Sequence, residues 1–246
     1  MRDWLFDLGN SRFKFAPLQD GRAGDVQAWA HGAEQMTAAA IGALPSGRVA
    51  YVASVASLQL TSVVLQTLQT RFERVLIART SSECAGIRIA YAQPDKFGID
   101  RFLGLIAAAP SQVPVLLVGV GTALTIDLID AGGRHHGGRI AASPTTMREA
   151  LHQRAIQLPA VGGEYMEFAN DTADALASGC DGAAVALVER SRAEATTLLG
   201  EVPRLWLHGG GAPALMPLFD AQTEHHPSLV LDGLARWAVH QTPPAG

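Results

Sequence analysis

The residues with the clearest chemical potential lie near the N-terminus, in Asp7-Leu8-Gly9-Asn10-Ser11-Arg12-Phe13-Lys14. Gly9 allows the backbone to approach a phosphate closely, and successive N–H groups can form an anion-binding nest. Lys14 adds a positive charge, and Asp7 has the oxygen ligands that Mg²⁺ prefers, directly or through water. The segment indicates a phosphate-binding turn. An ordinary polar hairpin turn uses the same residue types, so that alternative stays open here.

Two later segments have similar glycine chemistry. Gly121-Thr122 repeats the logic of Gly9-Asn10, a bare backbone followed by a polar side chain, and Gly209-Gly210-Gly211 lies between a predicted strand and a predicted helix. This third segment allows a flat ligand such as adenine to approach, although a plain connecting loop explains it equally well. The chain contains no GxxxxGK[ST] segment and no GxGxxG after its first strand, which argues against P-loop and dinucleotide-binding folds.

A third kind of chemistry is indicated by Asp100 and Arg101, at the start of a predicted helix over 99–109. The exposed N–H groups of a helix N-terminus keep a carboxylate ionised, and an ionised carboxylate can accept a proton as a general base. Arg101 can hold a substrate carboxylate with two parallel hydrogen bonds. The alternatives are a first-turn capping aspartate and a surface ion pair.

The elements that would position these residues form a repeat. A strand, a small-residue turn and a second strand occur at 4–17 and again at 115–129. Such internal repetition suggests two similar lobes that face each other, with ligands between them. We expect an N-terminal lobe over 1–113 and a C-terminal lobe over 114–246.

Composition excludes several classes of function. The chain has 246 residues, 48% of them apolar and 17% charged, with a net charge of -4 and no run of Lys and Arg. This favours a globular protein and argues against nucleic acid as a partner. The apolar runs are too short to cross a bilayer, and the N-terminus lacks the apolar core of a signal peptide. We expect no membrane partner and a cytoplasmic location.

The histidines suggest no metal site. His135-His136 and His225-His226 are adjacent pairs, and neighbours in a strand point to opposite faces. We expect surface positions and assign these residues no role.

Six segments, in this order along the chain, resemble the motifs of one family, the type III pantothenate kinases. They run from residue 7 to residue 212 and comprise Asp7-x-Gly9-Asn10-Ser11-x-x-Lys14, Gly98-Ile99-Asp100-Arg101, Gly121-Thr122-Ala123-x-Thr125-x-Asp127, Gly137-Gly138-x-Ile140, Asn170-x-Thr172 with Ser178-Gly179, and Gly209-Gly210-x-Ala212. Each match alone is weak, and their common order makes the resemblance strong.

The resemblance implies an α/β fold with two similar actin-like (ribonuclease H-like) lobes and a nucleotide cleft between them. It implies a homodimer that uses ATP and Mg²⁺ to phosphorylate pantothenate to 4'-phosphopantothenate, the first step of coenzyme A synthesis. Asp100 is the expected general base, and Asp7 is the expected Mg²⁺ ligand. The implied ATP-binding residues are Asp7, Leu8, Gly9, Asn10, Ser11, Arg12, Phe13, Lys14 and Thr122, and the implied substrate-binding residues are Tyr91, Gly98, Ile99, Asp100, Arg101 and Thr172. A core position for Tyr91 and a helix N-cap role for Thr172 stay open.

One position departs from the family pattern. Gly119 stands where the family usually has an aspartate that helps to bind a monovalent cation, potassium or ammonium. Glycine offers only its backbone carbonyl, so either other oxygens bind the cation or the protein does not need it. We expect weak or absent activation by potassium.

Two other functions on the same fold remain as alternatives. One is a sugar kinase or an exopolyphosphatase-type phosphatase, and the other is an actin-like nucleotide-binding protein without catalysis. Gly98-x-Asp100-Arg101 and the short chain favour pantothenate.

Overall fold

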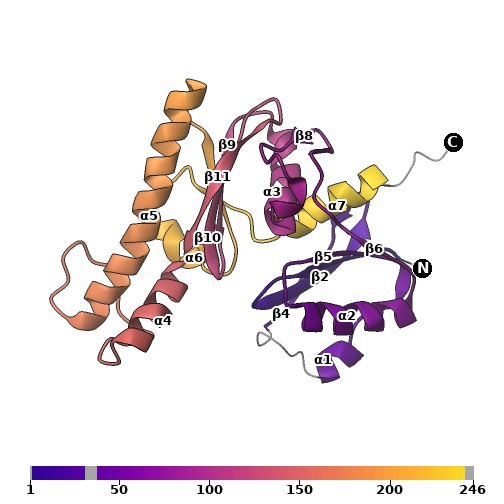
Figure 1. The fold of residues 1–246 in the computed structure, drawn as a ribbon, viewed down its shortest axis with the longest axis horizontal. Helices are drawn as coiled ribbons and strands as arrows, with labels where there is room; N and C mark the ends of the chain where they lie inside the picture. Colours follow the sequence, from indigo (N-terminus) through magenta and orange to yellow (C-terminus); the bar gives the residue numbers. More distant parts are fainter. Residues whose placement is uncertain (1, 31–37, 242–246) are drawn as a thin grey trace. The chain divides into compact units, whose positions relative to one another are not determined.

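The computed structural model describes residues 2–30 and 38–241 (Figure 1). The chain forms two compact units. Unit 1 contains the described residues of 1–112, 132–135 and 228–246, and unit 2 contains 113–131 and 136–227.

Unit 1 is built on a six-stranded sheet with the order β3-β2-β1-β5-β6, in which β4 pairs with β2. Its phenylalanines Phe6, Phe13 and Phe15 are buried, because alternate residues of β1 and β2 face one side of the sheet. The strands are β1 (Trp4–Leu8), β2 (Arg12–Gln19), β3 (Arg22–Ala23), β4 (Gln27–Ala30), β5 (Gly47–Ser54), β6 (Phe72–Ile77), β7 (Glu83–Cys84) and β8 (Ile87–Arg88). The helices are α1 (Ala38–Gly42), α2 (Leu58–Arg71), α3 (Ile99–Ala108) and α7 (Leu229–Gln241), with 3-10 turns η1 (Pro94–Lys96) and η2 (Ala109–Ser111).

Two helical layers cover the sheet of unit 1 (Figure 1). The amphipathic helix α2 buries Leu60, Val64 and Leu68 in the phenylalanine core, at the four-residue spacing of a single helix face. On the other face, α7 packs against β1 and against α3. A side chain at Gly233 would collide with the backbone of Leu103, so this glycine allows α3 and α7 to pack closely.

Unit 2 is built on a five-stranded sheet with the order β11-β10-β9-β12-β13. Helix α5 covers it through Ala184, Val188 and Ala195. The strands are β9 (Val115–Val120), β10 (Ala123–Ile129), β11 (His135–Ala142), β12 (Arg204–His208) and β13 (Glu224–His225). The helices are α4 (Pro144–Arg154), α5 (Thr172–Leu199) and α6 (Ala212–Leu215), followed by the 3-10 turn η3 (Met216–Leu218).

The two sheets repeat one pairing pattern. In unit 1, β1 pairs antiparallel with β2 and parallel with β5, which pairs parallel with β6. In unit 2, β9 pairs antiparallel with β10 and parallel with β12, which pairs parallel with β13. The predicted α/β class with two similar lobes is confirmed.

The units differ from the expected lobes, 1–113 and 114–246, at the C-terminus. The described residues from Ser228 to Gln241 belong to unit 1, because α7 packs against α3 and the first sheet. The segment Gly132–His135, which follows β10 and ends at the first residue of β11, also belongs to unit 1.

Candidate active site

The first predicted phosphate turn joins β1 to β2 in unit 1. The N–H of Gly9 donates to the carbonyl of Arg12 at 3.0 Å, which closes a tight hairpin and leaves the side chains of Asn10, Ser11 and Arg12 exposed. Leu8 and Phe13 are fully buried on either side of the turn. Their side chains anchor the hairpin in the core, so only their backbone groups could face a nucleotide.

Charged side chains gather beside this turn. Asp7 and Lys14 are both half-buried and lie opposite each other in the register of β1 and β2. Burial raises the pKa of Asp7 to about 7, while the charge of Lys14 lowers this pKa and the charge of Asp100 raises it. Burial also lowers the pKa of Lys14, against the opposing effect of Asp7. Residues from β1, β2 and α3 therefore share one electrostatic environment within unit 1.

The structure gives a reason for glycine at position 98 that the sequence did not reveal. It is the N-cap of α3, and its carbonyl accepts the N–H of Phe102 at 3.0 Å. A side chain at Gly98 would place its Cβ 2.7 Å from the Asp100 Oδ1 atom. The glycine therefore leaves room for the Asp100 carboxylate. Ile99, the residue between them in the sequence, is half-buried. The expected position of Asp100 in the first turn of α3 is confirmed.

Arg101 is not the surface residue of the alternative interpretation, because its side chain is only 7% exposed. Its Nη1 donates to the Tyr91 hydroxyl at 3.3 Å. Its Cζ lies 4.7 Å from the ring centre of Phe97 and 5.8 Å from that of Tyr91. The guanidinium is thus held by aromatic faces and by a half-buried tyrosine.

The second predicted turn joins β9 to β10 in unit 2. The N–H of Gly121 donates to the carbonyl of Ala123 at 3.0 Å, and Gly121 and Thr122 are exposed. The Thr146 hydroxyl donates to the Thr122 carbonyl at 2.6 Å, which ties the turn to α4. As in the first turn, a glycine N–H closes the hairpin, but the second turn is one residue shorter.

Thr172 is exposed at the first position of α5 in unit 2. The N-cap is the preceding residue, Asp171, whose carboxylate accepts from the N–H groups of Ala173 and Asp174. The alternative of Thr172 as an N-cap is therefore wrong.

The glycines after β12 are required by packing within unit 2. Gly209 has a φ of 94°, and a side chain there would collide with the Val120 carbonyl. A Cβ at Gly211 would lie 2.6 Å from Val120 Cγ1. The predicted helix after them is α6, which has only four residues. Contact with β9 explains these two glycines without a ligand, and the adenosine assignment stays a prediction.

Neighbouring side chains fill the space beside Gly119. Thr125 on β10 and His208 on β12 lie opposite it in the sheet register. A Cβ at Gly119 would lie 2.5 Å from Thr125 Oγ1 and 2.9 Å from His208 Nε2. Position 119 thus lacks a carboxylate and also lacks room for one as the side chains stand.

Three of the four paired histidines differ from the surface positions expected for them, whereas His225 is exposed as expected. His136 is half-buried and its Nε2 lies 2.7 Å from Asp130 Oδ2, and His226 stacks on Trp206 with ring centres 3.9 Å apart. His135 is only 1% exposed and lies against Tyr91 and Phe97. Strand alternation predicts that adjacent histidines point to opposite faces, but it does not show which of them faces a core.

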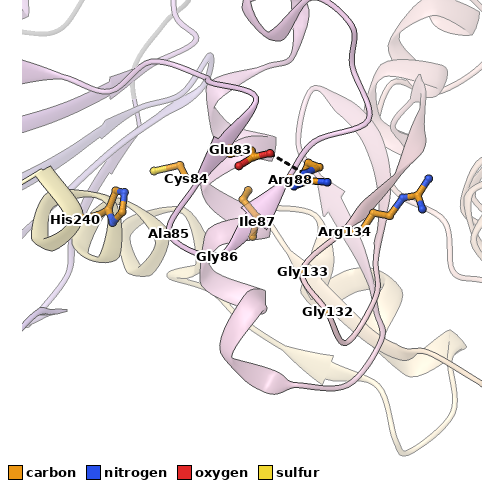
Figure 2. A pocket seen from close by; sticks show the side chains of 10 residues that line it. All are labelled: Glu83, Cys84, Ala85, Gly86, Ile87, Arg88, Gly132, Gly133, Arg134 and His240. Carbon is orange, nitrogen blue, oxygen red and sulfur yellow. Dashed lines mark hydrogen bonds and ion pairs between the residues drawn. The ribbon is translucent and has the colours of Figure 1, made fainter.

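Figure 2 shows a pocket of about 550 Å³ in unit 1, formed by the β7–β8 hairpin, the Gly132–Arg134 segment and His240. None of the predicted site residues lines it. The N–H of Arg88 donates to the Gly133 carbonyl at 2.9 Å, and a side chain at Gly133 would collide with the Gly86 carbonyl. The hairpin and the segment before His135 are therefore in direct contact.

Solved structures of similar shape identify the fold. A Campylobacter jejuni protein described as a Baf family transcriptional activator has a TM-score of 0.64 and 20% identity, over 96% of this chain and 97% of that chain. A Sinorhizobium meliloti protein described as a 2-dehydro-3-deoxygalactonokinase has a TM-score of 0.59 and 15% identity, over 97% of this chain and 99% of that chain. At these identities the likeness shows the fold alone, and the fold is the actin-like α/β fold with two sheet lobes.

Sequence comparison then identifies the family. The type III pantothenate kinase family model matches residues 4–194. A type III pantothenate kinase from Stenotrophomonas maltophilia (strain K279a) is 74% identical over 246 residues, all of both chains. One from Xanthomonas campestris pv. campestris (strain B100) is 66% identical over 244 residues, 99% of this chain and 100% of the relative. The chain belongs to the type III pantothenate kinase family, and it is a kinase.

Proposed function

We propose that this kinase transfers the γ-phosphoryl group of ATP to the hydroxyl of pantothenate that becomes the 4'-phosphate, with Asp100 as general base. The product, 4'-phosphopantothenate, leads to coenzyme A. Family membership supports the reaction. The placement of the Asp100 carboxylate over Gly98, where its charge acts on Asp7, supports the assignment of the base.

The proposed chemistry uses one proton acceptor. The Asp100 carboxylate accepts the hydroxyl proton while the hydroxyl oxygen forms a bond to the γ-phosphorus. The bond between this phosphorus and the β–γ bridging oxygen breaks, and ADP leaves with that oxygen. Arg101 cannot serve as the base, since its guanidinium stays protonated.

The nucleotide assignment uses the turn between β1 and β2. Its residues Asn10, Ser11 and Arg12 are exposed, and its backbone N–H groups and the Lys14 ammonium suit phosphate oxygens. We propose that the exposed residue Thr122 of unit 2 contributes its hydroxyl. Asp7 is suited to bind a cation. Burial disfavours the charged form of its carboxylate, and a nearby positive ion would favour that form. Mg²⁺ bound there would neutralise charge on the phosphates.

The substrate carboxylate is assigned to Arg101. Its guanidinium is held by Phe97 and Tyr91 rather than loose in solvent, so part of the entropy cost of ordering it is already met. We propose that Tyr91, Gly98, Ile99 and Thr172 also contact pantothenate, as the family resemblance implies.

The residues around Gly119 do not fit the family's monovalent cation. The position has no carboxylate, and the imidazole of His208 and the hydroxyl of Thr125 occupy the adjacent space. We propose that potassium activates this enzyme weakly or not at all.

We also propose a homodimer, which the family resemblance implies, and a cytoplasmic location, which the sequence pattern favours. In the part of the chain that the structure describes, no helix is long and apolar enough to span a membrane.

The test is a coupled assay of ADP release with ATP, Mg²⁺ and pantothenate. Asp100→Asn should lower kcat by about a hundredfold to ten-thousandfold, because the amide cannot accept the proton. ATP binding, measured by calorimetry, should be retained. Asp95→Asn is the matched control, since Asp95 is an exposed aspartate in the nearby turn η1. Near-normal kcat in Asp100→Asn, or ADP release that does not require pantothenate, would contradict the proposal.

A further inference from the structure

His135 is the most buried of the histidines in the described residues, at 1% exposed. It follows exposed Arg134 and ends the segment Gly132–His135 that packs with unit 1. Burial of a polar ring needs hydrogen-bond partners, and the His135 Nδ1 atom accepts the backbone N–H of Ala90 at 3.3 Å. In the neutral ring, this acceptor role places the proton on Nε2.

The His135 ring lies against the two aromatic residues that hold Arg101. It stacks on Tyr91, with ring centres 6.2 Å apart and planes 15° apart, and it packs on Phe97 with ring centres 5.0 Å apart. Tyr91 and Phe97 also contact each other, with ring centres 4.8 Å apart. The three rings form one cluster, and the guanidinium of Arg101 lies over two of its members.

The backbone on both sides fixes the position of His135. The Gly132–Arg134 segment lies beside the β7–β8 hairpin (Figure 2). The N–H of Arg88 donates to the Gly133 carbonyl and joins the two. Gly133 has a φ of 82°, a backbone conformation that favours glycine. It also packs against the Gly86 backbone so closely that a side chain would collide with it. The Ala90 bond then links His135 to the residue just before Tyr91.

We propose that His135 is a positioning residue for recognition of the substrate carboxylate. Its ring supports Tyr91 and Phe97, and these in turn hold the Arg101 guanidinium at the angle needed for a bidentate grip. This inference rests on the proposed function, in which Arg101 binds the carboxylate of pantothenate. His135 touches neither substrate nor reacting atoms in this account, so its effect should appear in substrate preference.

The experiment compares pantothenate with pantothenol, in which a hydroxymethyl group replaces the carboxylate. His135→Asn keeps an acceptor for the Ala90 N–H and removes the ring, while His135→Phe keeps a ring and removes the acceptor. In His135→Asn the kcat/KM preference for pantothenate over pantothenol should fall by about threefold to tenfold, the value of an aromatic packing contact. The loss should lie mainly in the KM for pantothenate, and His135→Phe should recover part of it.

Two further variants make the outcomes distinct. His136→Asn is the matched control, because His136 pairs with Asp130 and has no described contact with Tyr91 or Phe97. Arg101→Lys should lose most of the preference for pantothenate. If Arg101→Lys lowers the preference and His135→Asn affects both substrates equally or neither, the role of His135 is refuted while the function stands. If Arg101→Lys keeps the preference, the carboxylate assignment fails and the inference about His135 fails with it.

Discussion

The two strand–turn–strand segments share one pattern of strand pairing but carry different charges. Asp7 of β1 and Gly119 of β9 hold equivalent positions, one residue before the strand end in each case. Their antiparallel partners are Lys14 and Thr125, and their parallel partners are Ala53 and His208. Unit 1 therefore places a carboxylate and an ammonium beside its turn, where unit 2 places a glycine, a hydroxyl and an imidazole.

This difference shows that the sheet pattern and the chemistry are separable. The hairpin hydrogen bonds and the alternation of buried residues set the shape of each turn, whereas the charges beside it depend on which side chains the neighbouring strands carry. The strongly perturbed charges of the predicted site lie in unit 1, where α3 adds Asp100 to Asp7 and Lys14. We expect the equivalent side chains of the two turns to differ sharply in their effect on catalysis.

The largest expected difference is between Lys14 and its equivalent. Lys14→Met should lower kcat/KM for ATP by about a hundredfold or more, because it removes a positive charge that stabilises the phosphates. Thr125→Val should lower it by less than about threefold, since only one neutral hydroxyl is lost. Steady-state kinetics at saturating pantothenate measures both. Similar losses in the two variants would contradict the functional asymmetry of the turns.

A smaller effect is expected from adding a side chain at Gly119. Gly119→Ala should lower the free energy of unfolding by about 1–3 kcal/mol, because its Cβ would crowd Thr125 and His208. His208→Ala should relieve part of this cost, so a double-mutant cycle in urea should give a favourable coupling energy.

Gly121→Ala is the matched stability control for this cycle. A Cβ there would meet only the Ala123 carbonyl, at an ordinary 3.8 Å. Additive effects of Gly119→Ala and His208→Ala would show that the imidazole does not limit the space at position 119.

The smallest expected effect is that of potassium. Replacing a choline salt by potassium at constant ionic strength should change kcat by less than about twofold, because position 119 has no carboxylate oxygen for the ion. The coupled assay with wild-type protein measures this. Strong stimulation would show that other oxygens bind the cation despite Gly119.

Local patterns predicted much of the fold. The helix expected over 99–109 is observed as Ile99–Ala108. The ends of α5 also follow local signals, because an aspartate caps its start and Gly200 adopts the left-handed conformation at its end. The strand–turn–strand repeat was visible because turn glycines and alternating apolar residues are local signals. The packing of α7 in unit 1 was not predicted, since it depends on contact between Gly233 and the distant Leu103.

The site shows the same division between local and distant information. The residue types and spacing alone determined the candidate chemistry: the turn with Asp7 and Lys14, the aspartate that begins α3, and the order of motifs that placed the chain among the type III pantothenate kinases. Only the tertiary structure decided that His135 lies against Tyr91, that Gly98 makes room for the Asp100 carboxylate, and that His208 fills the space beside Gly119. Motif chemistry is local in the chain, whereas burial and side-chain contact depend on which distant strands and helices pack together.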